Sequence, residues 1–238
     1  MKKRIKIIVP VTTSMWNEPT LREMEKYKDS ETSLDIINLK KGSESISNSY
    51  DVAWSAIFTL QEVEKAAKEG YDGIIIYCTA DPALQAAKEA VEIPVVGLGE
   101  ASAIFALLLG HKFGILTAGS SEKGTHISME ILKMYELYHK CVGALGIGVP
   151  VLDLKEGDEK EISSFIELGR RLIEKGADVI ILGCGGIFGV AEAVSCELGI
   201  PVIIPAAAAL KMCEAMISMG VAQSKKGFYP PAVKKRIM

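Results

Sequence analysis

The sequence Tyr71-Asp-Gly-Ile-Ile-Ile-Tyr-Cys78 has a close match further along the chain in Ala177-Asp-Val-Ile-Ile-Leu-Gly-Cys184. The two aspartates and the two cysteines are separated by the same 106 positions. Each run is short, apolar and rich in β-branched residues, which is typical of a buried strand in a parallel sheet. A repeat with so long a period is not a solenoid unit, and it indicates two similar halves.

Short apolar runs and amphipathic helical patterns alternate along the chain, which predicts parallel strands connected by helices. Strands are expected near 4–9, 34–39, 73–78, 93–97, 113–117, 149–153, 178–183 and 201–204. Helices are expected near 19–28, 52–69, 82–90, 100–109, 123–139, 159–175, 187–198 and 206–219. We therefore predict an α/β fold with two pseudo-symmetric, Rossmann-like (flavodoxin-like) halves. No Pro/Gly/Ser-rich linker separates them, so they are expected to share a central cleft.

The composition limits the class of protein. Of the 238 residues 49% are hydrophobic and 24% charged, which is enough to build a core. The net charge of −3 comes without a basic tract, so no nucleic-acid partner is expected. No apolar run approaches the ~20 residues of a membrane span. The odd number of cysteines and the absence of a signal-peptide pattern favour free thiols in the cytoplasm.

Cys78 and Cys184 each stand where a predicted strand ends and a helical pattern begins. Side chains at the carboxyl ends of parallel strands face the crevice in which such sheets bind ligands. The N-terminus of a following helix would lower the pKa of a thiol from about 8.5 towards neutrality. Two equivalent thiols across one cleft suit the inversion of a stereocentre. One removes a proton from one face of a carbon, and the other delivers a proton to the opposite face.

A plainer interpretation is that cysteines in apolar segments act as small hydrophobic side chains of the core. We assign that role to Cys141, Cys196 and Cys213. Repetition at equivalent strand ends favours the catalytic interpretation for Cys78 and Cys184. The residues that directly follow them are candidate donors to a carbonyl oxygen of the intermediate: Thr79, Gly185 and Gly186.

No cofactor or metal is expected. The run Gly183-Cys-Gly-Gly-Ile-Phe-Gly189 misses the Gly-x-Gly-x-x-Gly spacing of a dinucleotide loop, and close approach of the backbone to a small ligand explains it better. No lysine stands out as a Schiff-base site, and the histidines lie apart from the cysteines. Asp81 and Glu100 are assigned to helix caps.

Longer motifs make the sequence similar to a known family. Cys78-Thr-Ala-Asp-Pro82, followed by Ile93-Pro-Val-Val-Gly-Leu-Gly-Glu-Ala101, resembles the first-cysteine region of the aspartate/glutamate/hydantoin racemase superfamily. Gly176-Ala-Asp-Val-Ile-Ile-Leu-Gly-Cys-Gly-Gly186 resembles the second-cysteine region. Gly42-Ser-Glu-Ser-Ile-Ser-Asn-Ser-Tyr-Asp51 is similar to a segment of the hydantoin racemase branch. The resemblance covers about residues 4–215.

The resemblance implies an active site between the halves, with Cys78 and Cys184 as a metal-free and cofactor-independent acid/base pair. It implies a first half made of residues 1–98 and 205–238, and a second half made of residues 99–204. The implied reaction inverts the carbon next to a carbonyl in a small molecule, a 5-substituted hydantoin or related amino-acid derivative. We also expect a homo-oligomer. The implied substrate-binding residues are Pro10, Val11, Thr12, Thr13, Thr79, Thr117, Gly185 and Gly186.

The first-strand loop departs from the hydantoin branch, which usually carries Asn-Pro-Asn-Thr there. This chain has Val9-Pro-Val-Thr12 and therefore lacks both amides as hydrogen-bond partners. Ser47 and Ile204 stand where acidic residues are common. A more apolar pocket than that of the branch is expected.

Three other functions stay open on such a scaffold. A maleate isomerase also uses two cysteines, whereas an arylmalonate decarboxylase-like enzyme needs only the second cysteine as proton donor. A non-catalytic small-molecule-binding protein is the third, because a fold does not fix a function. A racemase should incorporate solvent deuterium at the α-carbon even from a single-enantiomer substrate. A binding protein would bind a ligand without turnover, and serine in place of either cysteine would not affect that binding.

Overall fold

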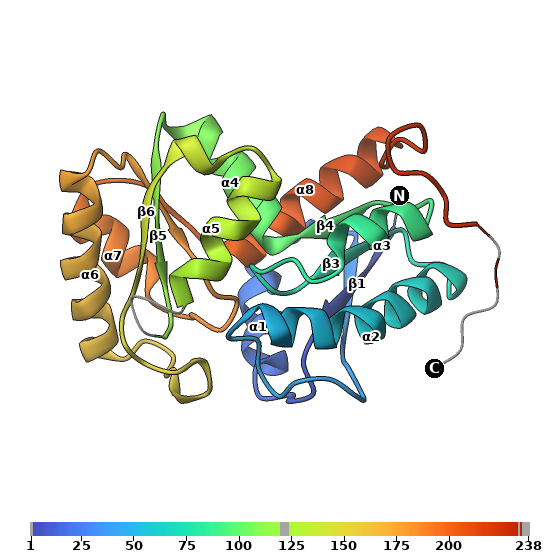
Figure 1. Ribbon diagram of the computed structural model, residues 1–238, viewed down its shortest axis with the longest axis horizontal. Helices are drawn as coiled ribbons and strands as arrows, with labels where there is room; N and C mark the ends of the chain where they lie inside the picture. The colour runs from blue at the N-terminus through green and yellow to red at the C-terminus, as the bar shows by residue number, and fades with distance from the viewer. Residues whose placement is uncertain (1, 120–123, 233, 235–238) are drawn as a thin grey trace.

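The computed structural model describes residues 2–119, 124–232 and 234. Within them lie two four-stranded parallel sheets, one in each half of the molecule (Figure 1). The first sheet has the order β2 (Thr32–Asn38), β1 (Lys3–Val9), β3 (Gly73–Ile76) and β4 (Val95–Gly97). The second has the order β6 (Cys141–Gly146), β5 (Phe113–Thr117), β7 (Val179–Leu182) and β8 (Val202–Ile203). The two topologies are the same, and the predicted α/β fold with two similar halves is confirmed.

The repeated apolar runs form inner strands, β3 and β7, whose residues are all buried. The aspartate before each run satisfies backbone N–H groups near the start of the neighbouring strand. The Asp72 carboxylate accepts a hydrogen bond from the N–H of Arg4 at 2.7 Å. Asp178 accepts from the N–H groups of His111 and Lys112 at 2.8 and 2.9 Å. This shared task explains why the aspartate recurs with the strand.

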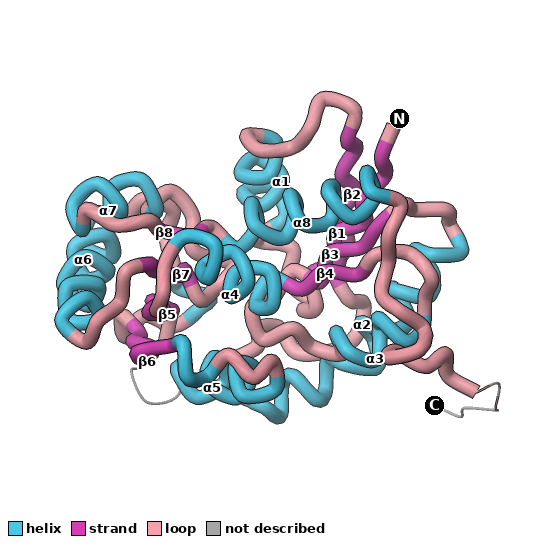
Figure 2. The backbone as a smooth tube through the Cα atoms, turned by 90° about the horizontal axis from the view of Figure 1, so that it is seen from above, coloured by secondary structure: helices cyan, strands magenta, loops and turns pink. Residues whose placement is uncertain are grey.

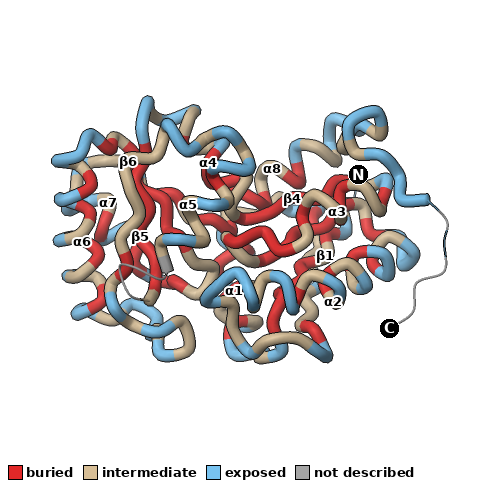
Figure 3. Tube along the Cα trace, in the orientation of Figure 1, coloured by how far each residue is buried: buried red, intermediate tan, exposed pale blue. Residues whose placement is uncertain are grey.

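Helices cover the sheets (Figure 3). Two of them begin with side-chain caps: Asn48 accepts from the N–H of Asp51 before α2, and Asp158 accepts from the N–H groups of Lys160 and Glu161 before α6. No helix in the described ranges combines the length and apolar character needed to cross a bilayer. The helices are α1 (Asn17–Glu25), α2 (Ser49–Lys68), α3 (Leu84–Ala90), α4 (Leu98–Leu109), α5 (Gly124–Met134), α6 (Glu159–Glu174), α7 (Ala191–Leu198) and α8 (Pro205–Met219).

The strand predicted near 149–153 is wrong. The edge strand β6 lies at residues 141–146, and Val151–Asp153 form a turn of 3₁₀ helix. β6 contains two glycines and is mostly half-buried, so it lacks the continuous apolar pattern of an inner strand. The helix predicted over 123–139 is shorter, because α5 ends at Met134 and Glu136 adopts a φ of 59°. Residue 123 lies outside the described ranges.

Two helices join the halves. α8 follows β8 of the second sheet but packs on β3 and β4 of the first, and α4 follows β4 but packs on β7 (Figure 2). One apolar cluster, which includes Ile75, Ile181 and Leu210, extends across both sheets. On this basis we propose residues 1–98 with 205–238 as one half and 99–204 as the other. Of these, residues 1, 120–123, 233 and 235–238 lie outside the described ranges.

Replacing Gly73 by alanine is expected to lower the free energy of unfolding by about 1–3 kcal/mol. A Cβ at this position would lie 2.5 Å from the Cys213 sulfur and 3.0 Å from Ile217 Cδ1, so α8 would have to move away from β3. Urea unfolding followed by circular dichroism measures the change. Gly227→Ala is the control, since its nearest neighbour would be 3.8 Å away. Equal unfolding midpoints for the two variants would contradict the close packing of α8 on β3.

Candidate active site

A pocket of about 950 Å³ lies between the two halves. Four of its walls stand at the carboxyl ends of β1, β3, β5 and β7, namely residues 9–11, 77–80, 117–119 and 183–186. Other walls come from residues 45–50 at the start of α2, residues 126–128 of α5, and the loop residues 148 and 150–152. Parallel sheets bind ligands at this edge, and here the corresponding edges of two sheets face one cavity.

Cys78 and Cys184 both line this pocket, one from each half. Each lies two residues beyond the end of a repeated strand, β3 or β7. Both thiols are free and half-buried. Burial raises the pKa of Cys78, and the charge of Cys184 adds to this effect. The repeat therefore brings two equivalent thiols to a single cavity.

The prediction that helix N-termini lower the pKa of these thiols is wrong. α3 begins at Leu84 and α7 at Ala191, so a loop separates each cysteine from the next helix. The helix dipole acts within about one turn and does not reach the sulfurs. Burial raises the pKa of Cys78 to about 12, and it also raises the pKa of Cys184. Both groups are neutral thiols at neutral pH, and their thiolates are strong bases.

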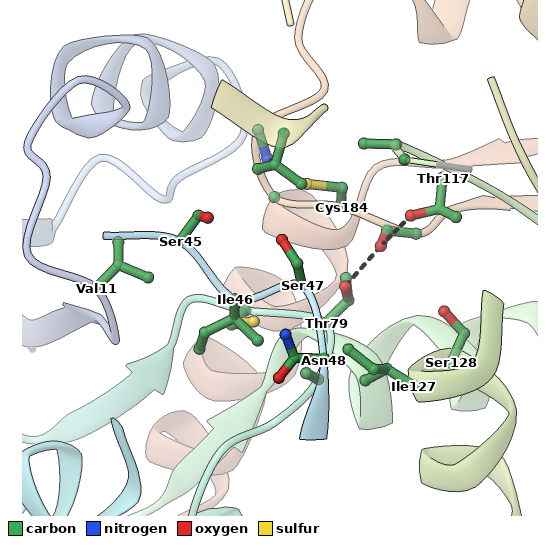
Figure 4. Close-up of a pocket in the computed structure, with 18 of the residues that line it drawn as sticks. Val11, Ser45, Ile46, Ser47, Asn48, Thr79, Thr117, Ile127, Ser128 and Cys184 are labelled. Atoms are coloured by element: carbon green, nitrogen blue, oxygen red, sulfur yellow. Dashed lines mark hydrogen bonds between the residues drawn. The ribbon is translucent and has the colours of Figure 1, made fainter. Parts of the chain in front are cut away.

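Thr79 and Thr117 place their hydroxyl groups on one wall, from different halves of the molecule (Figure 4). Both donate a hydrogen bond to the carbonyl oxygen of Gly183, at 2.7 and 3.0 Å. A carbonyl oxygen carries no proton, so both hydroxyl protons point towards Gly183. The lone pairs of the two hydroxyls remain to accept hydrogen bonds from a ligand.

Most of the substrate-binding residues implied by the resemblance lie at the pocket. Thr12 and Thr13 are not among its lining residues. Thr12 donates its N–H to the carbonyl of Ser43 at 3.0 Å, and the Thr13 hydroxyl accepts from the N–H of Met15 at 3.4 Å. The residues that do line it are Pro10, Val11, Thr79, Thr117, Gly185 and Gly186.

Two of these positions require glycine because aromatic rings approach the backbone. A Cβ on Gly185 would lie 2.8 Å from Tyr77 Cε1, and a Cβ on Gly186 would lie 3.0 Å from Trp16 Nε1. The buried Tyr77 hydroxyl also donates to the carbonyl of Gly185 at 3.1 Å. The loop of Cys184 is therefore held by aromatic side chains of the first half.

Several walls were not assigned to the site from the sequence. One signal was present, because the segment 42–51 resembles the hydantoin branch and residues 45–50 of it line the pocket. Tyr77 directly precedes Cys78 but was not assigned to the site, and the others come from loops or helices that lie away from the cysteines in the sequence. These further lining residues are Trp16, Tyr77, His126, Ile127, Ser128, Pro150, Val151 and Leu152.

The described residues that line the pocket include no Asp, Glu, Lys or Arg. The described walls combine apolar side chains such as Val11, Ile46 and Leu152 with hydroxyl groups, the amide of Asn48 and the imidazole of His126. Among these described residues a charged ligand would meet no Asp, Glu, Lys or Arg, and a buried charge without a partner costs several kcal/mol. The described walls are partly apolar and partly able to form hydrogen bonds.

Comparisons with known proteins agree with one another. The family described as Asp/Glu/Hydantoin racemase matches residues 5–213. A hydantoin racemase of Pseudomonas sp. (strain NS671) is 30% identical over 98% of this chain and 93% of its own length. The structure of allantoin racemase from Klebsiella pneumoniae has a TM-score of 0.90 at 31% identity, over 98% of this chain and 95% of that one. An arylmalonate decarboxylase mutant shares the fold, with a TM-score of 0.62 at 18% identity over 92% of this chain and 94% of its own. With the family match extending over most of its length, this chain belongs to the Asp/Glu/Hydantoin racemase family.

Proposed function

We propose that this protein is a cofactor-independent racemase of a neutral cyclic substrate, a 5-substituted hydantoin or related amino-acid derivative. Cys78 and Cys184 are its paired acid and base. The observation that carries the proposal is the convergence of two repeated cysteines on one pocket, whose described lining residues include no Asp, Glu, Lys or Arg. Membership of a racemase family makes the chain an isomerase. The cytoplasmic location and the homo-oligomeric state stay predictions.

In the proposed reaction one cysteine is a thiolate and the other a thiol. The thiolate removes the proton from the α-carbon, so an S–H bond forms, the C–H bond breaks, and the electron pair moves onto the carbonyl oxygen. The opposing thiol then gives its proton to the other face of the carbon, which restores the carbonyl and leaves a thiolate there. The reverse reaction exchanges the two roles. A thiolate of raised pKa is a strong base, which suits a weakly acidic C–H group.

The hydrogen-bonding groups of the pocket match a ring with amide N–H groups. The Thr79 and Thr117 hydroxyls keep lone pairs for N–H donors of the substrate, since their protons point to Gly183. The Thr79 hydroxyl is therefore not a donor to the substrate carbonyl, whereas the backbone N–H of Thr79 stays a predicted donor. The backbone N–H of Gly185 is a further predicted donor to the developing oxyanion. The N–H of Gly186, also predicted as a donor, donates to the Cys184 sulfur at 3.4 Å.

A neutral hydantoin is expected to react at least about 100-fold faster than the corresponding free amino acid. Among the described lining residues the charges of the zwitterion would meet no Asp, Glu, Lys or Arg, and about 2.7 kcal/mol of the cost of burying them is enough for this factor. Enantiopure hydantoins and amino acids are incubated in D₂O, polarimetry gives the rate of inversion, and NMR gives the exchange of the α-hydrogen. The double variant with serine at both cysteines is the control for uncatalysed exchange.

The same assay separates the alternatives. Loss of CO₂ from an arylmalonate would favour the decarboxylase, and conversion of maleate to fumarate would favour the maleate isomerase. Binding of a hydantoin without exchange, unchanged by serine at either cysteine, would favour a binding protein. Faster reaction of the free amino acid would contradict the preference for a neutral substrate.

A further inference from the structure

Asp81 lies three residues after Cys78, and its side chain is buried, with 3% of the residue exposed. Its carboxylate accepts hydrogen bonds from the N–H of Gly99 at 2.9 Å and the N–H of Glu100 at 2.7 Å, both in the first turn of α4. It also accepts from the hydroxyl of Tyr135, just beyond α5, at 2.7 Å. One side chain thus connects the loop of Cys78 to two elements that follow much later in the chain.

The loop itself has an unusual backbone. Asp81 and Ala83 adopt φ values of 45° and 61°, a region that most side chains avoid. The N–H of Asp81 donates to the carbonyl of Cys78 at 3.0 Å, which closes a turn that begins at the cysteine. Such a conformation persists only where the surroundings hold it in place. The carboxylate of Asp81 is the group that does so.

The start of α4 approaches this loop so closely that only glycine fits. A Cβ on Gly97 would lie 2.2 Å from Asp81 Oδ1, and a Cβ on Gly99 would lie 2.3 Å from the carbonyl oxygen of Thr79. The backbone that carries Cys78 is therefore in direct contact with the N-terminus of α4. Because α4 packs on the second sheet, this contact couples the position of Cys78 to the position of the half that carries Cys184.

The second half holds its cysteine differently. Ile187 occupies the position that matches Asp81 in the repeat, and its side chain is apolar and buried. The Cys184 loop is instead held by two hydrogen bonds. The hydroxyl of Tyr77 donates to the carbonyl of Gly185, and the N–H of Gly186 donates to the Cys184 sulfur at 3.4 Å. A change at Asp81 therefore acts directly on one thiol of the pair and not on the other.

Keeping the Asp81 carboxylate ionised in a buried position lowers the stability of the fold. Burial, with a smaller contribution from the charge of Glu100, raises the pKa of Asp81 to about 7, although the hydrogen bonds that its carboxylate accepts lower the pKa. Glu100 itself pairs with Lys88. Since the folded pKa of Asp81 exceeds the unfolded value, the stability it provides is present below about pH 4 and is lost as the pH rises through about 7. Near neutral pH the ionised group opposes folding, so stability alone does not account for it.

We propose that Asp81 is a positioning residue that sets the Cys78 loop for proton transfer on one face of the substrate. The role in transfer rests on the two-thiol reaction proposed above. The loss of its hydrogen bonds displaces Cys78 while Cys184 stays in place. A displacement of about 1 Å costs roughly 100-fold in a proton-transfer step.

The test compares Asp81→Asn with Asp178→Asn. Asparagine tolerates a positive φ and keeps the size of the side chain, but its amide NH₂ cannot accept the second backbone N–H. Asp178 is the matched control, because it also accepts two backbone N–H groups but stands at the start of the strands, away from the pocket. Tyr135→Phe removes a single hydrogen bond to Asp81 and serves as a milder variant.

In D₂O, Asp81→Asn is expected to slow inversion in both directions by about 10- to 100-fold. Exchange of the α-hydrogen should fall by a similar factor only for the enantiomer that Cys78 deprotonates, and should stay within about twofold for the other. The serine variants at the two cysteines identify which enantiomer that is. Asp178→Asn should change neither rate. A purely structural role would lower exchange of both enantiomers equally, and that result, or no change in either, would overturn the proposal.

A second readout needs no substrate. Alkylation by iodoacetamide, mapped by mass spectrometry, gives the reactivity of Cys78 relative to Cys184 in each variant. Asp81→Asn is expected to raise this ratio several-fold, whereas Asp178→Asn should give the same ratio as the wild type. An unchanged ratio in Asp81→Asn would overturn the positioning role. If the ratio rises but the wild type does not racemise hydantoins, the proposed function fails while the positioning of Cys78 by Asp81 stands.

Discussion

Serine in place of either Cys78 or Cys184 is expected to lower the rate of inversion by about 10²- to 10⁴-fold, the usual contribution of a general acid or base. A hydroxyl is a far weaker acid than a thiol, so each variant lacks either the base or the donor that inversion needs. The remaining thiolate still removes the proton on its own side and returns deuterium from solvent. Cys78→Ser should therefore retain exchange for one enantiomer, and Cys184→Ser for the other.

Polarimetry and proton NMR in D₂O measure inversion and exchange on the same sample. Cys196→Ser is the control, because this cysteine lies outside the pocket and is exposed on α7, so its predicted place in the core is wrong. Inversion near the wild-type rate in either pocket variant would show that the corresponding thiol is not essential. Loss of activity in Cys184→Ser alone would favour the single-thiol chemistry of a decarboxylase.

The value of kcat/KM for inversion is expected to rise about 100-fold between pH 7 and pH 9, since below its pKa a thiol gains a factor of ten in thiolate per pH unit. The sign follows from burial, which raises the pKa of Cys78 to about 12 and also raises that of Cys184. The reaction needs one thiolate and one thiol, and the apparent pKa belongs to the pair. The profile should therefore climb through this range without a maximum.

Initial rates between pH 6 and pH 9 measure this profile. Circular dichroism at each pH confirms that the protein stays folded. Iodoacetamide labelling of the two cysteines over the same range gives an independent thiolate titration. A plateau or a maximum near neutral pH would contradict the effect of burial, and would indicate that the surroundings lower the pKa of at least one thiol.

The position of the two cysteines could be predicted from the sequence because it depends on local patterns. The apolar runs at 73–76 and 179–182 are long enough to identify inner strands, and the polarity changes directly after them. Parallel pairing then brings both strand ends to the cavity, whatever the details of the loops. The repeated aspartate, Asp72 in one half and Asp178 in the other, allowed the two halves to be aligned residue by residue from the sequence alone.

The electrostatic environment of the thiols could not be predicted in this way. It depends on where α3 and α7 begin. In the loop after Cys78, Asp81 and Ala83 adopt positive φ values, and no sequence pattern indicates them. The walls at Ile127, Val151 and Leu152 likewise reach the pocket only through tertiary packing. Edge strand β6 escaped detection for a related reason, since a half-buried strand with two glycines has little apolar alternation.

The chain passes between the two sheets twice, once from β4 into α4 and once from β8 into α8. A pair of covalent tethers constrains motion more than one, because twisting or sliding of one sheet relative to the other would stretch one of the connections. Bending about the line through both tethers is the motion that stretches neither. We expect any relative motion of the two halves to follow this bending, which would change the separation of the two thiols across the pocket.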